Sequence, residues 1–289
     1  MSTIGRVAGN AGRLLQSPDM LAAYARWLLA GREPVAAFYG GISICGFASF
    51  SEYWSRRSGV DPVDLSVLEL VSSIVPNGEA KVAIDAGANL GTVSLAMAKA
   101  GFDRIYAFEP VPKTYHAFLA NLERNPDLAG QIVAEPWGLA AHPGETMFDI
   151  RPNSPGQNKM SPATNPIAGA SVLRCDMTTV DRYLGNLNGK VALLKIDVEG
   201  FECEVLKGAD KTLRSGRIQF IYSEVIPQAL LDAGSSLEEF GGLLSSYGFE
   251  PIVFSPTAPD RLLPTTLHDA LSWAGARRNV LFRRKDNRN

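Results

Sequence analysis

Residues Val82–Gly91 read Val-Ala-Ile-Asp-Ala-Gly-Ala-Asn-Leu-Gly, and this stretch predicts the centre of the fold. The apolar run Val82–Ile84 lacks alternation, which is typical of a strand buried on both faces of a parallel sheet. The run leads into a turn that contains Asp85, Gly87, Asn89 and Gly91. A helical pattern follows and ends at Gly101. A strand, a glycine-bearing turn and a helix start together predict a site where backbone N–H groups can meet an anionic ligand.

The next predicted strand indicates the class of ligand. Ile105–Phe108 is a second buried apolar run, and it ends in Glu109. An acid at the tip of the second strand of such a unit is placed to accept hydrogen bonds from both hydroxyls of a ribose. The sequence therefore predicts that a nucleotide-type cofactor binds here, with Glu109 holding its sugar.

The sequence of the turn distinguishes between two types of cofactor that bind to such an arrangement. A dinucleotide site requires the pattern G-x-G-x-x-G, so that a pyrophosphate can approach bare backbone. Asn89 stands here in place of a glycine, and Asp85 would repel a pyrophosphate. The same acid suits an amino group, such as that of the methionine half of S-adenosylmethionine. We therefore predict a methyl-donor site whose methionine pocket is shaped by Gly87, Asn89 and Gly91.

Three blocks of sequence carry a resemblance to a known family. They are Ile84–Gly91, Ala107–Pro110 and Leu194–Glu202, the last extended by Val205–Ala209. Together they resemble the FkbM family of S-adenosylmethionine-dependent methyltransferases. The resemblance implies a doubly wound, Rossmann-like α/β sheet of seven strands with the last one antiparallel. It also implies transfer of the methyl group to a hydroxyl oxygen, and it assigns Pro110 together with Glu109 to the cofactor site.

The remaining strands follow along the chain. Predicted strands cover Ile132–Ala134, Val191–Ile196, Ile218–Ser223, Phe249–Phe254 and Asn279–Arg284, and helices are predicted from about 61 to 74, 112 to 125, 202 to 214 and 237 to 247. The short link between the last two strands favours a hairpin-like antiparallel pair. Trp137 and Gly138 follow the third strand, where the adenine ring would lie in such a fold. The Trp137 indole could stack on that ring or serve as ordinary packing.

Acidic residues at the ends of the fourth and fifth strands are the catalytic candidates. A hydroxyl acceptor needs a base or a metal to lower its pKa before it can attack. Asp197 and Glu199 bring two carboxylates together, and Glu224 adds a third from the neighbouring strand. Strand alternation places Lys195 on the same side as Asp197, where it can moderate their repulsion.

Two other interpretations of these acids stay open. Three oxygen donors on adjacent strand tips could hold Mg²⁺, which binds few carboxylates and keeps several waters. Alternatively, Glu199 or Glu224 caps the following helix or pairs with Lys195.

A pair of short strands is predicted at Gly144–Ile150 and Ala170–Cys175, around a proline-rich loop from 151 to 169. Loops of this length inside a compact domain are usually functional or disordered. In the resembling family a hairpin overhangs the reaction site here, so this loop is a candidate for substrate contact.

Residues 1–78 are predicted to form an N-terminal helical extension or cap, and residues 79–289 to form the methyltransferase domain. Ser17 and Pro18 predict a helix start and Gly31 its end. We expect this helix to pack on the catalytic domain or on a second copy of the chain, which would give a homo-oligomer. A membrane-surface helix is the alternative, although its polar face carries few cations.

Composition narrows the classes of function. The 289 residues are 46% hydrophobic and 20% charged, with a formal net charge of −2, so no electrostatic footprint for nucleic acid is present. No apolar run reaches the length of a membrane span. The three cysteines lack a zinc-type spacing and fit a reducing compartment, which predicts a cytoplasmic protein. The alternatives to a methyltransferase are an NAD-dependent oxidoreductase and a non-catalytic nucleotide-binding module.

Overall fold

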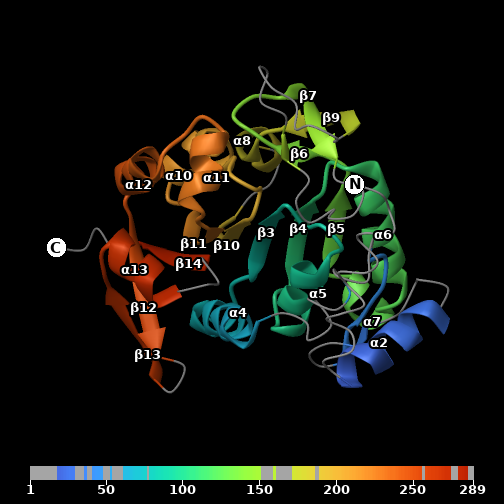
Figure 1. The fold of residues 1–289 in the computed structure, drawn as a ribbon. Helices are drawn as coiled ribbons and strands as arrows, with labels where there is room; N and C mark the ends of the chain where they lie inside the picture. Colours follow the sequence, from blue (N-terminus) through green and yellow to red (C-terminus); the bar gives the residue numbers. More distant parts are fainter. Residues whose placement is uncertain are drawn as a thin grey trace.

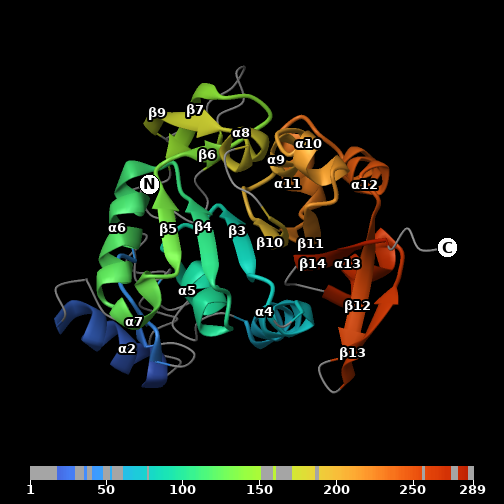
Figure 2. The same ribbon diagram turned by 180° about the vertical axis from the view of Figure 1, so that it is seen from behind.

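The computed structural model arranges the chain around one large mixed sheet, a smaller four-stranded sheet and a short two-stranded pair. It describes residues 18–29, 36–37, 41–47, 53, 61–76, 78–150, 159–160, 171–185, 189–255, 258–274 and 279–285. The large sheet has eight strands in the order β13-β12-β14-β11-β10-β3-β4-β5, which can be followed across Figures 1 and 2.

Five neighbouring strands of the large sheet run parallel. They are β3 (Val82–Ala86), β4 (Arg104–Phe108), β5 (Ile132–Glu135), β10 (Val191–Ile196) and β11 (Ile218–Glu224). Their carboxyl ends therefore meet at one edge of the sheet. The chain reverses its direction of progress across the sheet between β3 and β10, and ligands of open α/β sheets bind beside such a switch point.

The other three strands are antiparallel to their neighbours. β14 (Asn279–Arg284) pairs with β11, β12 (Phe249–Ser255) pairs with β14, and β13 (Ala258–Pro264) pairs with β12. The predicted antiparallel pairing of the last two strands is thus confirmed. The predicted count of seven strands is wrong, because β13 lies in the stretch taken as a short link. β13 contains Pro259 and Pro264, and it ends the row of strands, where proline is tolerated.

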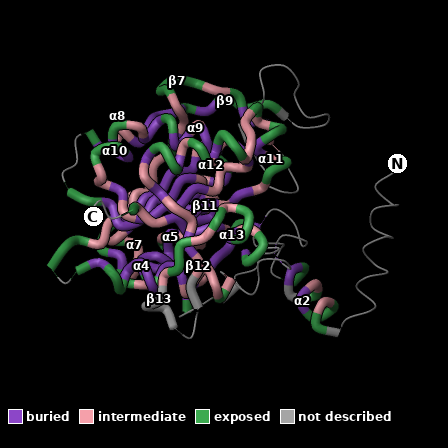
Figure 3. The backbone as a smooth tube through the Cα atoms, turned by 90° about the vertical axis from the view of Figure 1, so that its left-hand side faces the viewer, coloured by how far each residue is buried: buried purple, intermediate pink, exposed green. Residues whose placement is uncertain are grey.

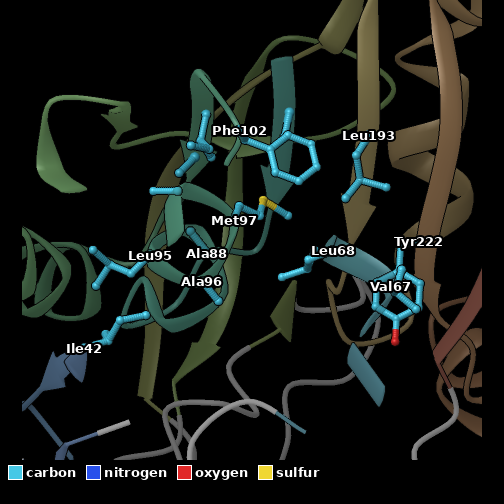
Figure 4. Close-up of a cluster of buried hydrophobic side chains, with 14 of the residues drawn as sticks. Ile42, Val67, Leu68, Ala88, Leu95, Ala96, Met97, Phe102, Leu193 and Tyr222 are labelled. Atoms are coloured by element: carbon cyan, nitrogen blue, oxygen red, sulfur yellow. The ribbon is translucent and has the colours of Figure 1, made fainter. Parts of the chain in front are cut away.

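Helices cover both faces of the large sheet. One core cluster contains Leu68, Leu95 and Phe118 from α4 (Pro62–Ile74), α5 (Thr92–Lys99) and α6 (Pro112–Glu123). Figure 4 shows part of this cluster, including Leu68, Leu95 and Tyr222. The opposite core cluster is supplied by α8 (Val180–Leu184), α9 (Glu202–Lys207), α10 (Asp210–Arg214), α11 (Pro227–Asp232), α12 (Leu237–Ser246) and α13 (Leu267–Ala274). The predicted doubly wound α/β fold is confirmed.

Local chemistry sets the limits of individual helices. Asp61 caps α4, because its side chain accepts a hydrogen bond from the Val63 N–H at 2.8 Å and Pro62 occupies the first turn. The single helix predicted from 202 to 214 is wrong, since α9 and α10 are separated at Gly208. A Cβ at Gly208 would lie 2.0 Å from the Ala140 carbonyl oxygen, so this glycine permits a close backbone approach there.

The four-stranded sheet lies beyond the ends of β4 and β5 (Figure 1). Its strands are β6 (Gly138–Leu139), β7 (Gly144–Ile150), β8 (Lys159–Met160) and β9 (Ser171–Thr178), in the order β6-β9-β7-β8. The two predicted short strands correspond to β7 and β9, which pair antiparallel over the whole length of β7. Most of the predicted substrate loop, residues 151–158 and 161–169, lies outside the described residues.

The N-terminal segment is fastened to the sheet through α6. It contains α2 (Pro18–Leu29), β1 (Ala36–Ala37) and β2 (Ser43–Ile44). Asn121 of α6 accepts a hydrogen bond from the Cys45 N–H at 2.8 Å and donates to the Leu90 carbonyl oxygen at 2.9 Å. Ile44 belongs to the same core cluster as Leu95. The division of the chain at residue 78 stays a prediction. Some short helices complete the described fold, among them α7 (Pro126–Ala129).

Burial follows the layers of the fold: the strands are mostly buried, whereas the outer faces of the helices and α2 carry exposed residues (Figure 3). Within the described part of the chain, none of the helices combines the length and the apolar character needed to cross a bilayer.

Gly91 provides a test of the packing beneath the first turn. Its φ is +79°, and a Cβ there would lie 2.1 Å from the Phe118 ring of α6. We expect Gly91→Ala to lower the free energy of unfolding by about 2–4 kcal/mol, through left-handed strain and overpacking. The matched control is Gly130→Ala, because no atom lies within 4 Å of its Cβ position. Urea unfolding of both variants measures this, and equal stabilities would contradict the packing described.

Candidate active site

A cavity of about 210 Å³ opens at the carboxyl edge of the large sheet, above β3, β4 and β10. Most of the predicted site residues line it, namely Gly87, Asn89, Glu109, Pro110, Gly138, Lys195, Asp197, Glu199 and Glu224. Asp85, Gly91 and Trp137 are not among the lining residues. The fold thus brings together residues far apart in sequence at a single hollow.

The first turn is shaped by close backbone approaches. Gly87 has a φ of +81°, and a Cβ on it would lie 2.0 Å from the Asp197 carbonyl oxygen. This glycine therefore lets the end of β10 lie directly against the turn. Asn89 also adopts a left-handed conformation, with φ +52°. Gly91 meets the Phe118 ring beneath the turn, so its requirement for glycine comes from packing and not from the cavity.

Glu109 faces the cavity from the end of β4 while its carboxylate is fixed by backbone donors. Its Oε1 accepts from the Val111 N–H at 2.9 Å, and its Oε2 accepts from the Asn89 N–H at 3.0 Å. Burial raises the pKa of Glu109 to about 7, although both N–H bonds and Lys195 oppose this rise. A carboxylate offers about four lone-pair positions, so two remain for hydroxyl donors from a ligand.

Asp85 lies beneath the turn, in a buried ion pair with Lys195. Its Oδ1 is 2.9 Å from Lys195 Nζ, and its Oδ2 accepts from the Ser94 hydroxyl at 2.6 Å. The Asp85 side chain is 0% exposed and that of Lys195 is 7% exposed. Asp85 is thus placed to fix Lys195 from below; its predicted contact with an amino group of the ligand stays untested.

Lys195 joins three parts of the site. Besides Asp85, its Nζ donates to the Gly87 carbonyl oxygen at 3.0 Å and lies 3.5 Å from Asp197 Oδ2. The predicted placement of Lys195 and Asp197 on the same side is therefore confirmed. Burial lowers the pKa of Lys195, but the charges of Asp85 and Asp197 outweigh burial, and the net pKa is raised. The lysine is a permanent cation in this site.

Three carboxylates converge at the ends of β10 and β11. Asp197, Glu199 and Glu224 each place an oxygen within 4.8 Å of the others. Burial raises the pKa of Glu224, and the negative charges of Asp197 and Glu199 raise it further. One of the three is therefore suited to hold a proton near neutral pH. All the ligand atoms are oxygens, the type that Mg²⁺ prefers, so the metal alternative stays open.

Glu202 is a buried acid of this site that the sequence did not single out. It is 2% exposed, and its Oε1 accepts from the Gly200 N–H at 3.1 Å and the Val198 N–H at 3.4 Å. These bonds hold the loop that carries Glu199, whose φ is +55°. Burial raises the pKa of Glu202 to about 7. The N-cap residues of α9 and α11, Phe201 and Ile226, make no side-chain hydrogen bond, so the capping role considered for Glu199 or Glu224 is not seen there. For Glu202, an acid at the first position of α9 was the available signal.

The four-stranded sheet supplies residues that the sequence missed. Phe148 of β7 and Met177 of β9 line the cavity opposite the strand tips. Only the strand pairing brings them there, so no local pattern could have assigned them. Trp137 is 37% exposed and lines a neighbouring cavity of about 610 Å³, which shares Met177 with the first. Its stacking on an adenine ring stays a prediction, whereas Gly138 faces the main cavity.

Comparison with known proteins identifies a family and several similar proteins. The Methyltransferase FkbM domain family matches residues 85–251. Methyltransferase sdnD of Sordaria araneosa is 33% identical over 156 residues, which cover 44% of this chain and 60% of that protein. Hexuronic acid methyltransferase AglP of Haloferax volcanii is 30% identical over 143 residues, which cover 49% of this chain and 54% of that protein.

Among solved structures, methyltransferase FkbM from Methylobacillus flagellatus KT is similar, with a TM-score of 0.45 and 17% identity. The likeness covers 81% of this chain and 50% of that one.

The buried ion pair gives a stability prediction. We expect Lys195→Met to lower the free energy of unfolding by about 3–5 kcal/mol, because it leaves the Asp85 charge buried without its cation. The control is Lys190→Met, whose ion pair with Glu79 at 3.3 Å is exposed to solvent and is worth about 1 kcal/mol at most. Urea unfolding at pH 7 measures both. A loss at Lys195 no larger than at Lys190 would show that Asp85 does not depend on this lysine.

Proposed function

Because the chain belongs to the FkbM methyltransferase family, we propose that it transfers a methyl group from S-adenosylmethionine to a hydroxyl oxygen of a small molecule, sugar or glycan. The observation that supports the donor is Glu109, a carboxylate fixed by two backbone N–H groups at the tip of β4 and facing the cavity. The name of the relative AglP, a hexuronic acid methyltransferase, supports a sugar-type acceptor.

The proposed donor site extends along the strand tips. Glu109 accepts the hydroxyls of the ribose, with Pro110 beside it, and Gly138 borders the purine. Gly87 and Asn89 border the methionine part, where the turn lies against β10. The donor supplies a methyl group on a positively charged sulfur, which departs as a neutral thioether.

The proposed chemistry of the chain is positioning and proton removal. The cavity holds the acceptor oxygen in line with the methyl group, which is the main requirement for an already activated donor. As the oxygen–carbon bond forms, the hydroxyl proton passes to a carboxylate of Asp197, Glu199 or Glu224. Lys195 keeps Asp197 in place during this transfer through their 3.5 Å contact. A divalent cation on the same three carboxylates is an alternative way to lower the hydroxyl pKa.

Donor binding tests the first half of this proposal. We expect S-adenosylhomocysteine, the demethylated product, to bind with micromolar affinity in isothermal titration calorimetry. Glu109→Ala should weaken this binding by about 10- to 100-fold, because two charge-assisted hydrogen bonds are lost. The control Glu123→Ala removes an exposed acid from α6. No heat with either the donor or its product would refute the methyl-donor site, and binding of NADH instead would favour an oxidoreductase.

The pKa of Glu109 adds a pH dependence to that binding. Because the pKa is raised to about 7, the free carboxyl is mostly protonated at pH 6 and mostly ionised at pH 8. Ribose hydroxyls bond more strongly to the ionised form, so affinity should rise by up to about tenfold between these pH values. In Glu109→Gln the rise should disappear.

Transfer itself is tested with a methyl-labelled donor and a cell extract as the source of acceptor. We expect label to appear in an extract product, and Asp197→Asn to lower the rate by roughly 100-fold or more, as expected for loss of a general base. Glu123→Gln is the control, since this acid is exposed at the end of α6. An unchanged rate in Asp197→Asn would exclude this residue as the base. Absence of any labelled product despite donor binding would favour a non-catalytic module.

A further inference from the structure

The part of the cavity at the carboxyl ends of β10 and β11 carries an excess of negative charge. Asp197, Glu199 and Glu224 all line it, with oxygens within 4.8 Å of one another. A second cavity of about 70 Å³ shares Asp197 and Glu224 and adds Asp64 to its wall. Like charges at this separation repel each other, even at the high effective dielectric constant of a protein surface.

Lys195 does not neutralise this cluster. It is the cation among the described residues that line the two cavities. Its ammonium group has three donors, and these meet Asp85 Oδ1 at 2.9 Å, the Gly87 carbonyl oxygen at 3.0 Å and Asp197 Oδ2 at 3.5 Å. The nearest carboxylate, Asp85, is fully buried and balances the lysine charge. Even when one of the three cavity acids holds a proton, the other two leave a surplus of negative charge.

The order of strands places this surplus at one end of the proposed donor. Glu109 lies at the tip of β4, whereas Asp197 and Glu224 lie at or beside the tips of β10 and β11, across β3. Gly138 is the first residue of β6, which follows β5, and β5 lies on the opposite side of β4. A donor whose ribose meets Glu109 and whose purine lies beside Gly138 therefore directs its sulfur toward the three acids.

We propose that Asp197, Glu199 and Glu224 make the reaction centre selective for charge. The site binds the positively charged sulfonium donor more tightly than its neutral thioether product. It also takes an acceptor that is uncharged or cationic around the reacting hydroxyl, and it rejects one that carries a carboxylate or phosphate there. This inference rests on the proposed function and names its class of acceptor. For this chain, a free hexuronate is a poor acceptor.

The same charge arrangement assists turnover. When the methyl group leaves, the sulfur loses its positive charge, and the attraction to the three acids falls at that moment. The acids thus contribute to donor capture without holding the product to the same extent. Interactions that differ between the bound states in this way avoid trapping the product.

Calorimetry with three ligands tests the donor half of the proposal. They are S-adenosylmethionine, S-adenosylhomocysteine, and sinefungin, which carries a protonated amine in place of the methylated sulfur. We expect the two cationic ligands to bind roughly 10- to 100-fold more tightly than S-adenosylhomocysteine. The double change Glu199→Gln with Glu224→Gln should remove most of this preference, with S-adenosylhomocysteine affinity altered less than about threefold.

An exposed acid that is not among the residues lining the two cavities provides the control. Glu238→Gln removes an exposed acid from α12 and should leave all three affinities unchanged. The single change Glu199→Gln replaces the double variant if the latter fails to bind S-adenosylhomocysteine. If no ligand binds the unaltered protein, the proposed function fails. If S-adenosylhomocysteine binds as tightly as the cations, the function stands and charge selection is refuted. If Mg²⁺ abolishes the preference for cationic ligands and a chelator restores it, charge selection is also refuted, because the acids then bind a metal.

The acceptor half is tested on products of the extract assay. Labelled product should pass through an anion-exchange column at pH 8, because the acceptor is uncharged or cationic. Product that the column retains would refute the acceptor class if mass spectrometry places an anionic group beside the methylated oxygen, whereas an anionic group remote from that oxygen would be consistent with it. Donor selectivity would still be judged separately by calorimetry.

Discussion

The ion pair between Asp85 and Lys195 is the interaction on which the site depends. It joins the end of β3 to the end of β10 at the point where the strand order reverses. Both side chains are withdrawn from solvent: that of Asp85 is 0% exposed and that of Lys195 is 7% exposed. A buried charge that lost its partner would carry a large desolvation penalty, so each residue fixes the other. The turn after β3 and the acid after β10 are therefore built as one unit.

Other features follow from this pairing. Lys195 reaches the Gly87 carbonyl oxygen as well as Asp85, which orients the turn peptide. The Asp197 carbonyl oxygen then lies so close to Gly87 that no side chain fits there. The requirement for glycine at this position thus arises from contact between two strand ends. The lysine charge is used to hold the scaffold, with Asp85 as its nearest partner.

Residues whose role is set by their own strand could be predicted from the sequence. The apolar runs of β3, β4 and β10 predicted buried parallel strands, and a polar residue at the end of each predicted a shared edge. Glu109 and Asp197 were found in this way, and both line the cavity. The start of α4 was predictable because its cap uses neighbours in sequence.

Residues whose role depends on distant pairing could not be predicted. Phe148 and Met177 reach the cavity through the register of β7 and β9, across a long loop. The partner of Gly91 is Phe118, on a helix one strand later. The strand β13 was missed because the stretch between β12 and β14 was taken as a link. Its prolines are compatible with a strand at the margin of a sheet, a position that local sequence does not reveal.

The loops on the two sides of the cavity are held in the same way. Among the described residues, Asn89 and Glu199 are the non-glycine positions with positive φ, and each belongs to a loop that borders the cavity. A buried glutamate bonds to the backbone of each loop: Glu109 to the Asn89 N–H, and Glu202 to the N–H groups on either side of Glu199. Hydrogen bonds to a carboxylate are strong enough to offset backbone strain of this kind. Burial raises the pKa of both glutamates to about 7, so the ionisation that strengthens these bonds takes place near neutral pH. The shape of the cavity is therefore coupled to the charge of the residues beneath it.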